Sequence, residues 1–109
     1  MTAPAPRIVL CCVVDSAPRI HVELVLWALC VTHVLPRDAI HPVVYFVGEV
    51  PEDLVTWVRE LGLETRFADP IVPGAPHCNK IIPFADHWSG AEFVAVCDVD
   101  LYFVDDPSP

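Results

Sequence analysis

Basic side chains are scarce in this 109-residue chain, and only one of them is a lysine, Lys80. Six lysine and arginine residues stand against fifteen aspartate and glutamate residues, which leaves a formal net charge of −9. Such an acidic surface repels phosphate backbones and anionic lipid headgroups, so we expect neither nucleic acid nor an anionic membrane surface as a partner. An anionic ligand would need a metal ion or helix N-termini to offset this charge.

Two phosphate-binding signatures are also missing. Glycine occurs only four times, no G-x-G-x-x-G follows the first apolar run, and G-x-x-x-x-G-K-[ST] occurs nowhere. Both patterns let backbone N–H groups approach a pyrophosphate closely. Their absence argues against a Rossmann dinucleotide site and against a P-loop, so a nucleotide would have to be held in another way.

Cysteine spacing suits neither a zinc site nor a disulfide framework, because the five cysteines include no C-x-x-C pair. Four of them lie in apolar runs, where a thiol behaves as a small hydrophobic group. Reduced thiols are typical of a cytoplasmic protein, which is the location we expect. The most apolar window, residues 20–35, is interrupted by polar side chains and is too short to span a membrane.

Apolar residues make up 54% of the chain and fall into segments of alternating type. Short runs rich in valine, isoleucine and phenylalanine predict strands buried on both faces, whereas longer patterns that begin near Ser16-Pro18 and Pro51 predict helices. Strands that alternate with helices indicate a single α/β domain over residues 1–109 with a mostly parallel sheet. The expected strands are residues 8–14, 42–47, 65–67 and 93–97, and the expected helices are residues 19–35, 51–61 and 79–88, with a proline-rich loop at residues 68–77.

An acidic D-x-D pattern, Asp98-Val99-Asp100, directly follows the last apolar run. Side chains alternate across an extended backbone, so we expect Asp98 and Asp100 to project to the same side. Two neighbouring carboxylates repel each other unless a cation relieves the repulsion. Mg²⁺ and Mn²⁺ prefer oxygen ligands, and Mg²⁺ is commonly held by one or two carboxylates together with substrate phosphates. The pattern therefore predicts a metal–diphosphate site at the end of a buried strand, while an acidic, solvated turn after a core strand stays open as the alternative.

Polar residues from three parts of the chain are expected at the same edge of the sheet. Asp15 follows the first strand, Asn79 and Lys80 begin a helix, and the D-x-D carboxylates end the fourth strand. Open parallel sheets bind ligands beyond the carboxyl ends of their strands. Acidic groups with one basic group suit a nucleoside diphosphate that is bridged by a metal ion. For Asp15 a role as a strand-end or capping residue stays open, and for Lys80 a role as a solvated helix-end residue.

Taken together, these residues resemble the N-terminal half of a GT-A glycosyltransferase, the nucleotide-diphospho-sugar transferase fold. The resemblance lies in a Rossmann-like β-α-β-α-β-loop-α-β order, in Asn79-Lys80 opening a helix, and in an apolar strand that ends in D-x-D. The continuation, residues 101–107, is also similar to the segment after D-x-D in several of these families. The resemblance extends over nearly the whole chain as architecture, but its specific part is confined to residues 78–80 and 93–107.

The resemblance implies roles for individual residues. Asp100 would ligate Mn²⁺ or Mg²⁺ bridging the diphosphate of a UDP- or GDP-sugar, and Asp98 would contact the metal, a metal-bound water or the ribose. The end of the first strand, Val14 and Asp15, would lie near the base or ribose. Asn79 and Lys80 would lie along the nucleotide.

In such enzymes the acceptor site, the catalytic base and a further metal ligand come from sequence after D-x-D. The catalytic residue and the acceptor are therefore unknown. We expect residues 1–109 to be a fragment of a longer chain, which need not be active alone. A missing C-terminal half would pack on the open sheet edge.

Two other interpretations remain. Haloacid-dehalogenase-like phosphotransferases also carry an apolar strand ending in D-x-D, with the first aspartate as nucleophile and the second as acid/base. Here Leu101-Tyr102 stand where that motif continues with x-[TV], and the pattern closes the chain instead of opening a domain. The third interpretation is a non-catalytic acidic α/β binding module whose carboxylates keep it soluble.

Overall fold

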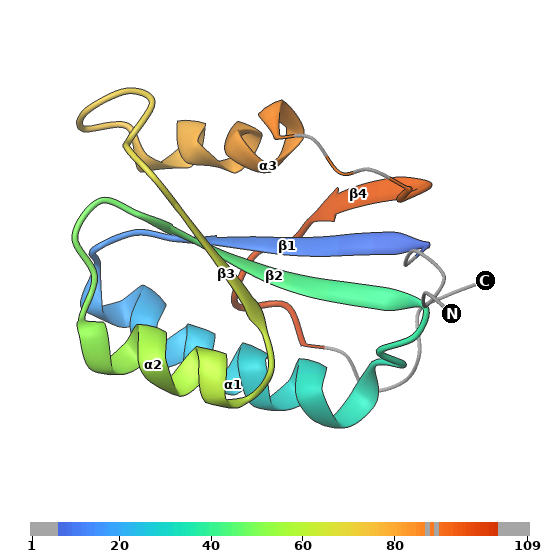
Figure 1. Ribbon diagram of the computed structural model, residues 1–109. Helices are drawn as coiled ribbons and strands as arrows, with labels where there is room; N and C mark the ends of the chain where they lie inside the picture. Colours follow the sequence, from blue (N-terminus) through green and yellow to red (C-terminus); the bar gives the residue numbers. More distant parts are fainter. Residues whose placement is uncertain (1–6, 87, 89, 103–109) are drawn as a thin grey trace.

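The computed structural model describes residues 7–86, 88 and 90–102 (Figure 1). Most of the residues expected to continue the D-x-D resemblance, 103–107, lie outside this range. The described part follows the predicted alternation of strands and helices, with an additional 3-10 helix, η1. The elements are β1 (Ile8–Val14), α1 (Pro18–Val34), β2 (Ile40–Val47), α2 (Glu52–Glu60), β3 (Glu64–Ala68), η1 (Pro76–Ile81), α3 (Ile82–Ala85) and β4 (Phe93–Val96).

The described strands form one four-stranded sheet in the order β3-β2-β1-β4. All neighbouring pairs are parallel, which confirms the predicted α/β class and the predicted parallel sheet. The chain runs outward from β1 through β2 to β3, and then returns to place β4 on the other side of β1. The order of strands therefore reverses between β1 and β4, which is where open α/β sheets bind ligands.

Helices cover both faces of the sheet, but unequally. Figure 1 shows α1 and α2 along one face and the shorter η1 and α3 across the other. Successive side chains of a strand point to opposite faces, so β1 contributes to both layers. Cys12 and Val14 belong to the core beneath α1 and α2, whereas Val9 and Cys11 belong to the core beneath α3. β1, which is mostly buried and lies between β2 and β4, is the central strand from which both layers are built.

β2 begins at Ile40, two residues before the predicted start, and carries Pro42 in its interior. A proline lacks the N–H that a ladder requires, so it is rare inside a central strand. Pro42 is in register with Leu10 of β1, while pairing with β3 begins only at Val43. Pro42 thus precedes the residues that pair with β3, and the hydrogen bonds between β2 and β3 are not interrupted by it.

The sequence of α1 leaves only a thin polar stripe beside Leu24, Leu26, Trp27, Leu29 and Val31 and so predicts a mostly buried helix, but α1 is less buried than that. Its inner face, which includes Leu24 and Trp27, packs against the sheet as expected. Leu26, expected to be buried, is 52% exposed, and Leu29 is also exposed. A helix on a sheet buries only the stripe that faces the strands, so apolar residues on the opposite stripe stay in solvent.

The helix expected at about residues 79–88, bent or interrupted at Pro83, forms only in part. A 3-10 helix runs from Pro76 to Ile81 and is followed by a four-residue α-helix. Pro83 lacks an N–H and clashes with the preceding turn, so a continuous α-helix through it is unfavourable. Asn79 and Lys80 consequently lie inside η1 and do not open a helix.

The last strand is shorter and more exposed than predicted. β4 pairs with β1 alone among the described strands, so one of its edges lacks a neighbouring strand there. Phe93 is exposed and the other three residues are only partly buried. The prediction of a strand buried on both faces therefore does not hold for β4. Separately, no helix within the described residues is long and apolar enough to cross a membrane.

Candidate functional site

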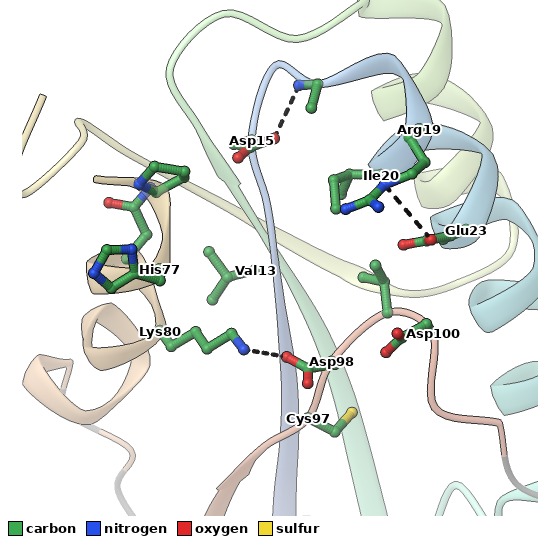
Figure 2. A pocket seen from close by; sticks show the side chains of 14 residues that line it. Val13, Asp15, Arg19, Ile20, Glu23, His77, Lys80, Cys97, Asp98 and Asp100 are labelled. Carbon is green, nitrogen blue, oxygen red and sulfur yellow. Dashed lines mark hydrogen bonds and ion pairs between the residues drawn. The ribbon is translucent and has the colours of Figure 1, made fainter. Parts of the chain in front are cut away.

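A pocket of about 440 Å³ lies at the carboxyl ends of β1 and β4, where the strand order reverses. Its walls come from the end of β1, the first turns of α1, the helix η1 and the turn after β4 (Figure 2). Small-molecule sites usually occupy roughly 300–1,000 Å³, so this volume is sufficient for a ligand. The topology therefore brings segments that are far apart in sequence to one cavity.

The two D-x-D carboxylates both line this pocket, but not because a strand orients them. β4 ends at Val96, and Asp98 begins a turn in which the Leu101 N–H donates to the Asp98 carbonyl at 3.1 Å. Val99, only 5% exposed, belongs to the core beneath α1. Val99 also lines the pocket but is anchored in the core, whereas Asp98 and Asp100 on either side of it are exposed.

Lys80 forms an ion pair with Asp98 across the pocket. Figure 2 shows the lysine side chain extending from η1 so that Nζ meets Asp98 Oδ1. Both side chains are more than half exposed, at 56% and 57%. The basic group expected along a nucleotide is thus present in the pocket, and it is paired with a D-x-D carboxylate.

Asp15 lines the pocket and also shapes the turn between β1 and α1. Its Oδ1 accepts a 2.9 Å hydrogen bond from the Ala17 N–H, an interaction typical of aspartate in tight turns. The N-cap position of α1 is Ala17 and no side chain caps it, so Ser16, which the sequence offers as a cap before Pro18, does not act as one. The strand-end interpretation of Asp15 therefore accounts for one of its oxygens.

Two other predicted residues serve the fold directly. Val14 is fully buried in the core beneath α1, and the pocket is lined by Val13 instead, which corrects the predicted position. Asn79 lines the pocket but is only 3% exposed, and its Oδ1 accepts a 3.1 Å hydrogen bond from the Ile71 N–H. Asn79 thereby attaches the loop after β3 to η1, and so positions the neighbouring Lys80.

Several pocket residues were not singled out from the sequence. Arg19 and Glu23 reach the pocket from successive turns of α1, with Arg19 Nε 3.9 Å from Glu23 Oε1. The sequence could have indicated both residues, because the helix after β1 starts at the carboxyl ends of the strands and residues four apart lie on the same helix face. By contrast, the sequence leaves open that His77, beside Cys78, approaches the site, although it favours a loop position; His77 lies in η1 and lines the opposite wall.

The Cys97 thiol also lines the pocket, directly before D-x-D. Burial raises the pKa of Cys97 to about 11. A thiol with such a pKa stays protonated near neutral pH, and only the thiolate is a good nucleophile or metal ligand. Cys97 is therefore a packing residue rather than a reactive group.

The residues present suit a metal ion that brings ligands of its own. Within the described ranges, no three or more histidine, cysteine, aspartate or glutamate side chains are grouped so as to hold a metal ion. Asp98 and Asp100 nevertheless offer carboxylate oxygens to one cavity. Mg²⁺ typically takes one or two carboxylates and completes its shell with water and substrate phosphates. The pair thus fits a metal bound together with a diphosphate better than a free ion.

In chemical terms, the pocket places carboxylates and cations around one cavity. Asp15, Asp98 and Asp100 bring negative charge, while Lys80 and Arg19 bring positive charge from η1 and α1. Such a lining can bind an anion directly through the cations, or indirectly through a metal ion on the carboxylates. Comparison with known proteins found no family model, no curated protein and no solved structure that matches the chain.

Proposed function

We propose that this chain is the donor-binding half of a metal-dependent glycosyltransferase of the GT-A type. Its ligand would be a nucleoside diphospho-sugar, held through Mn²⁺ or Mg²⁺. The observation that supports this most directly is that Asp98 and Asp100 line one pocket with the end of β1, at the reversal of strand order. Ligands of open α/β sheets bind at this position.

Within this proposal, different residues of the described part contact different portions of the ligand. Asp100 and Asp98 hold the metal ion from the turn after β4, while Val13 and Asp15 lie beside the nucleoside at the end of β1. Lys80 approaches the phosphates from η1. The metal, when bound, neutralises charge that develops on the departing diphosphate.

The acceptor site and the catalytic base belong to other parts of the protein in this proposal. The unpaired edge of β4 is where we expect a further structural unit to add to the sheet, since β4 pairs with β1 alone in the described part. We also place the protein in the cytoplasm, because Cys11 and Cys12 are buried as thiols.

Isothermal titration calorimetry with UDP and with GDP tests the proposal. We expect wild type to bind one of them in the presence of Mn²⁺ and to lose most of that affinity in EDTA. Asp100→Asn should lower the Mn²⁺-dependent affinity about tenfold or more, since metal ligands and their supports carry effects of that size. Asp38→Asn is the matched control, because it makes the same charge change at an exposed position. Asp38 precedes β2 and so lies near the amino ends of the strands, whereas the pocket lies at their carboxyl ends.

Two outcomes would contradict the proposal: nucleotide binding that ignores Mn²⁺, or an Asp100→Asn variant that binds like wild type. One observation favours a second candidate, a non-catalytic acidic binding module. The ion pair with Lys80 already neutralises Asp98 without a metal. Absence of UDP and GDP binding under all conditions, in a well-folded wild type, would support this second candidate.

A further inference from the structure

Lys80 and Asp98 join two walls of the pocket. The lysine comes from η1 and the aspartate from the turn after β4, and their ion pair lies at the D-x-D end of the cavity (Figure 2). The ammonium group therefore occupies a cation position on a carboxylate that the proposed function assigns to a metal ion. A metal ion on Asp98 would either displace Lys80 from Oδ1 or bind close beside its ammonium group.

We propose that the Lys80 ammonium holds the cation position on Asp98 and yields it only to a metal ion that arrives together with a diphosphate. The ligand of the pocket would then be the metal–nucleoside diphosphate complex and not the free metal ion. This inference rests on the proposed function and adds to it the order in which the components bind.

Electrostatics explains why the free ion is at a disadvantage. A divalent cation on Asp98 and Asp100 would leave the ammonium beside it, and two like charges a few ångströms apart repel each other even where water partly screens them. A diphosphate changes this balance, because its oxygens bridge to the metal and also offer the ammonium a new anionic partner. Lysine suits such an exchange, since its charge sits on a long flexible stem with rotatable donors.

The exposure of the pair makes the exchange feasible. Exposed ion pairs contribute little to stability because water screens them. Both partners are more than half exposed, so the pair discriminates between ligands without blocking the site permanently. Arg19, the other basic side chain in the pocket lining, lies 3.9 Å from Glu23 on α1, whereas Lys80 is paired with Asp98. The exchange is therefore proposed for Lys80.

Electron paramagnetic resonance of Mn²⁺ alone, which reports the free ion, provides the first arm of the test. We expect Lys80→Met to bind Mn²⁺ about fivefold more tightly than wild type, the upper range for loss of an exposed ion pair. Lys80→Arg should bind Mn²⁺ like wild type, because a guanidinium can still pair with Asp98. Arg7→Met is the matched control: it removes a cation from the exposed 3.0 Å pair with Glu92, at the far edge of the sheet.

Calorimetry with UDP or GDP in saturating Mn²⁺ provides the second arm. Lys80→Met should bind the nucleotide at least about threefold more weakly than wild type, because the ammonium can no longer contact the phosphates. The binding of Mn²⁺ and of the nucleotide is then less cooperative in Lys80→Met than in wild type, because the coupling between two ligands is reciprocal. Thermal melts confirm that each variant is folded.

The outcomes separate this inference from the proposed function. If wild type binds Mn²⁺–nucleotide but Mn²⁺ alone binds wild type and Lys80→Met equally, the exchange is overturned and the proposed function stands. If Arg7→Met gains as much Mn²⁺ affinity as Lys80→Met, net charge explains the effect and the exchange is again overturned. If wild type binds no nucleotide with Mn²⁺, both proposals fail together.

Discussion

The Tyr45 hydroxyl donates a 2.6 Å hydrogen bond to Asp86 Oδ2 and so links the middle of β2 to the end of α3. Arg66 of β3 donates to the same oxygen at 3.1 Å and lies over the Trp88 ring, 3.5 Å from its centroid. A four-residue helix is not stable by itself. These contacts therefore place α3 over the sheet, and with it η1 and Lys80.

Removal of the Tyr45 hydroxyl should loosen this attachment. We expect Tyr45→Phe to lower the free energy of unfolding by about 1 kcal/mol, the usual net value of one hydrogen bond, because Asp86 is partly exposed and regains water. Urea denaturation followed by circular dichroism measures the change. Tyr102→Phe is the control, since Tyr102 is exposed and its hydroxyl should matter by less than about 0.5 kcal/mol. Equal losses in the two variants would contradict the role of the Tyr45–Asp86 bond.

Stability should fall in acid because of Glu64. Partial burial raises the pKa of Glu64, but hydrogen bonds from His41 Nε2 at 2.8 Å and Arg66 Nε at 2.6 Å outweigh burial and hold the pKa below its usual value of 4.5. A carboxylate with a lowered pKa stabilises the fold above its unfolded pKa, and that stability is lost as the pH falls through the folded pKa. The hydrogen bond from Tyr45 likewise lowers the pKa of Asp86.

Glu64→Gln isolates this contribution. Wild type should lose stability between roughly pH 5 and pH 3, and the variant should lose less over the same range because it has no carboxylate to protonate there. The two proteins should therefore differ most near neutral pH. Chemical denaturation at several pH values measures both curves, and parallel curves with a constant offset would show that Glu64 ionisation does not contribute.

Val99 should be important for stability although it stands between two exposed aspartates. Val99→Ala removes two buried methyl groups and should cost about 2 kcal/mol, including the cavity left behind. Val22→Ala makes the same change at a residue that is 66% exposed on α1, and should alter stability by less than about 0.5 kcal/mol. Thermal or urea unfolding compares the two variants. A neutral Val99→Ala would contradict the anchoring of the D-x-D turn.

The buried thiols should report global unfolding. Burial raises the pKa of Cys11 to about 12 and that of Cys12 well above its ordinary value, and both side chains are fully buried. Only an accessible thiolate reacts quickly with a maleimide, so both should label slowly in native protein and rapidly in urea. Cys78, which is partly exposed, provides the comparison. Mass spectrometry of labelled peptides locates the reaction, and Cys11 labelling as fast as Cys78 in native protein would contradict the described burial.

Strands and the sheet class followed from local pattern. The run Ile8–Val14 matches β1 residue for residue, because an uninterrupted apolar segment bounded by polar residues has only one favourable place, the centre of a sheet covered on both faces. Gly62 lies just beyond α2 with a φ of +84°, which residues other than glycine rarely adopt, so this glycine marks the helix end in the sequence. These features depend on near neighbours in the chain, so the sequence alone reveals them.

Where the predictions failed, the deciding contacts were distant in sequence. The exposure of Leu26 depends on which side of α1 meets the sheet, and the exposure of Phe93 depends on β4 being an edge strand. Val13, and not Val14, lines the pocket because β1 presents alternate residues to opposite faces and only the fold shows which face is open. None of these three facts is encoded in a short window of residues.

By itself, the sequence determined the α/β class, the parallel sheet and the position of an acidic pair after the last strand, since hydrophobic periodicity and turn residues act over a few residues. Only the tertiary structure decided the strand order β3-β2-β1-β4, which depends on how whole segments pack. That order brings Asp98 beside the end of β1 and within reach of Lys80. The pocket is thus a product of long-range packing between segments that are each locally predictable.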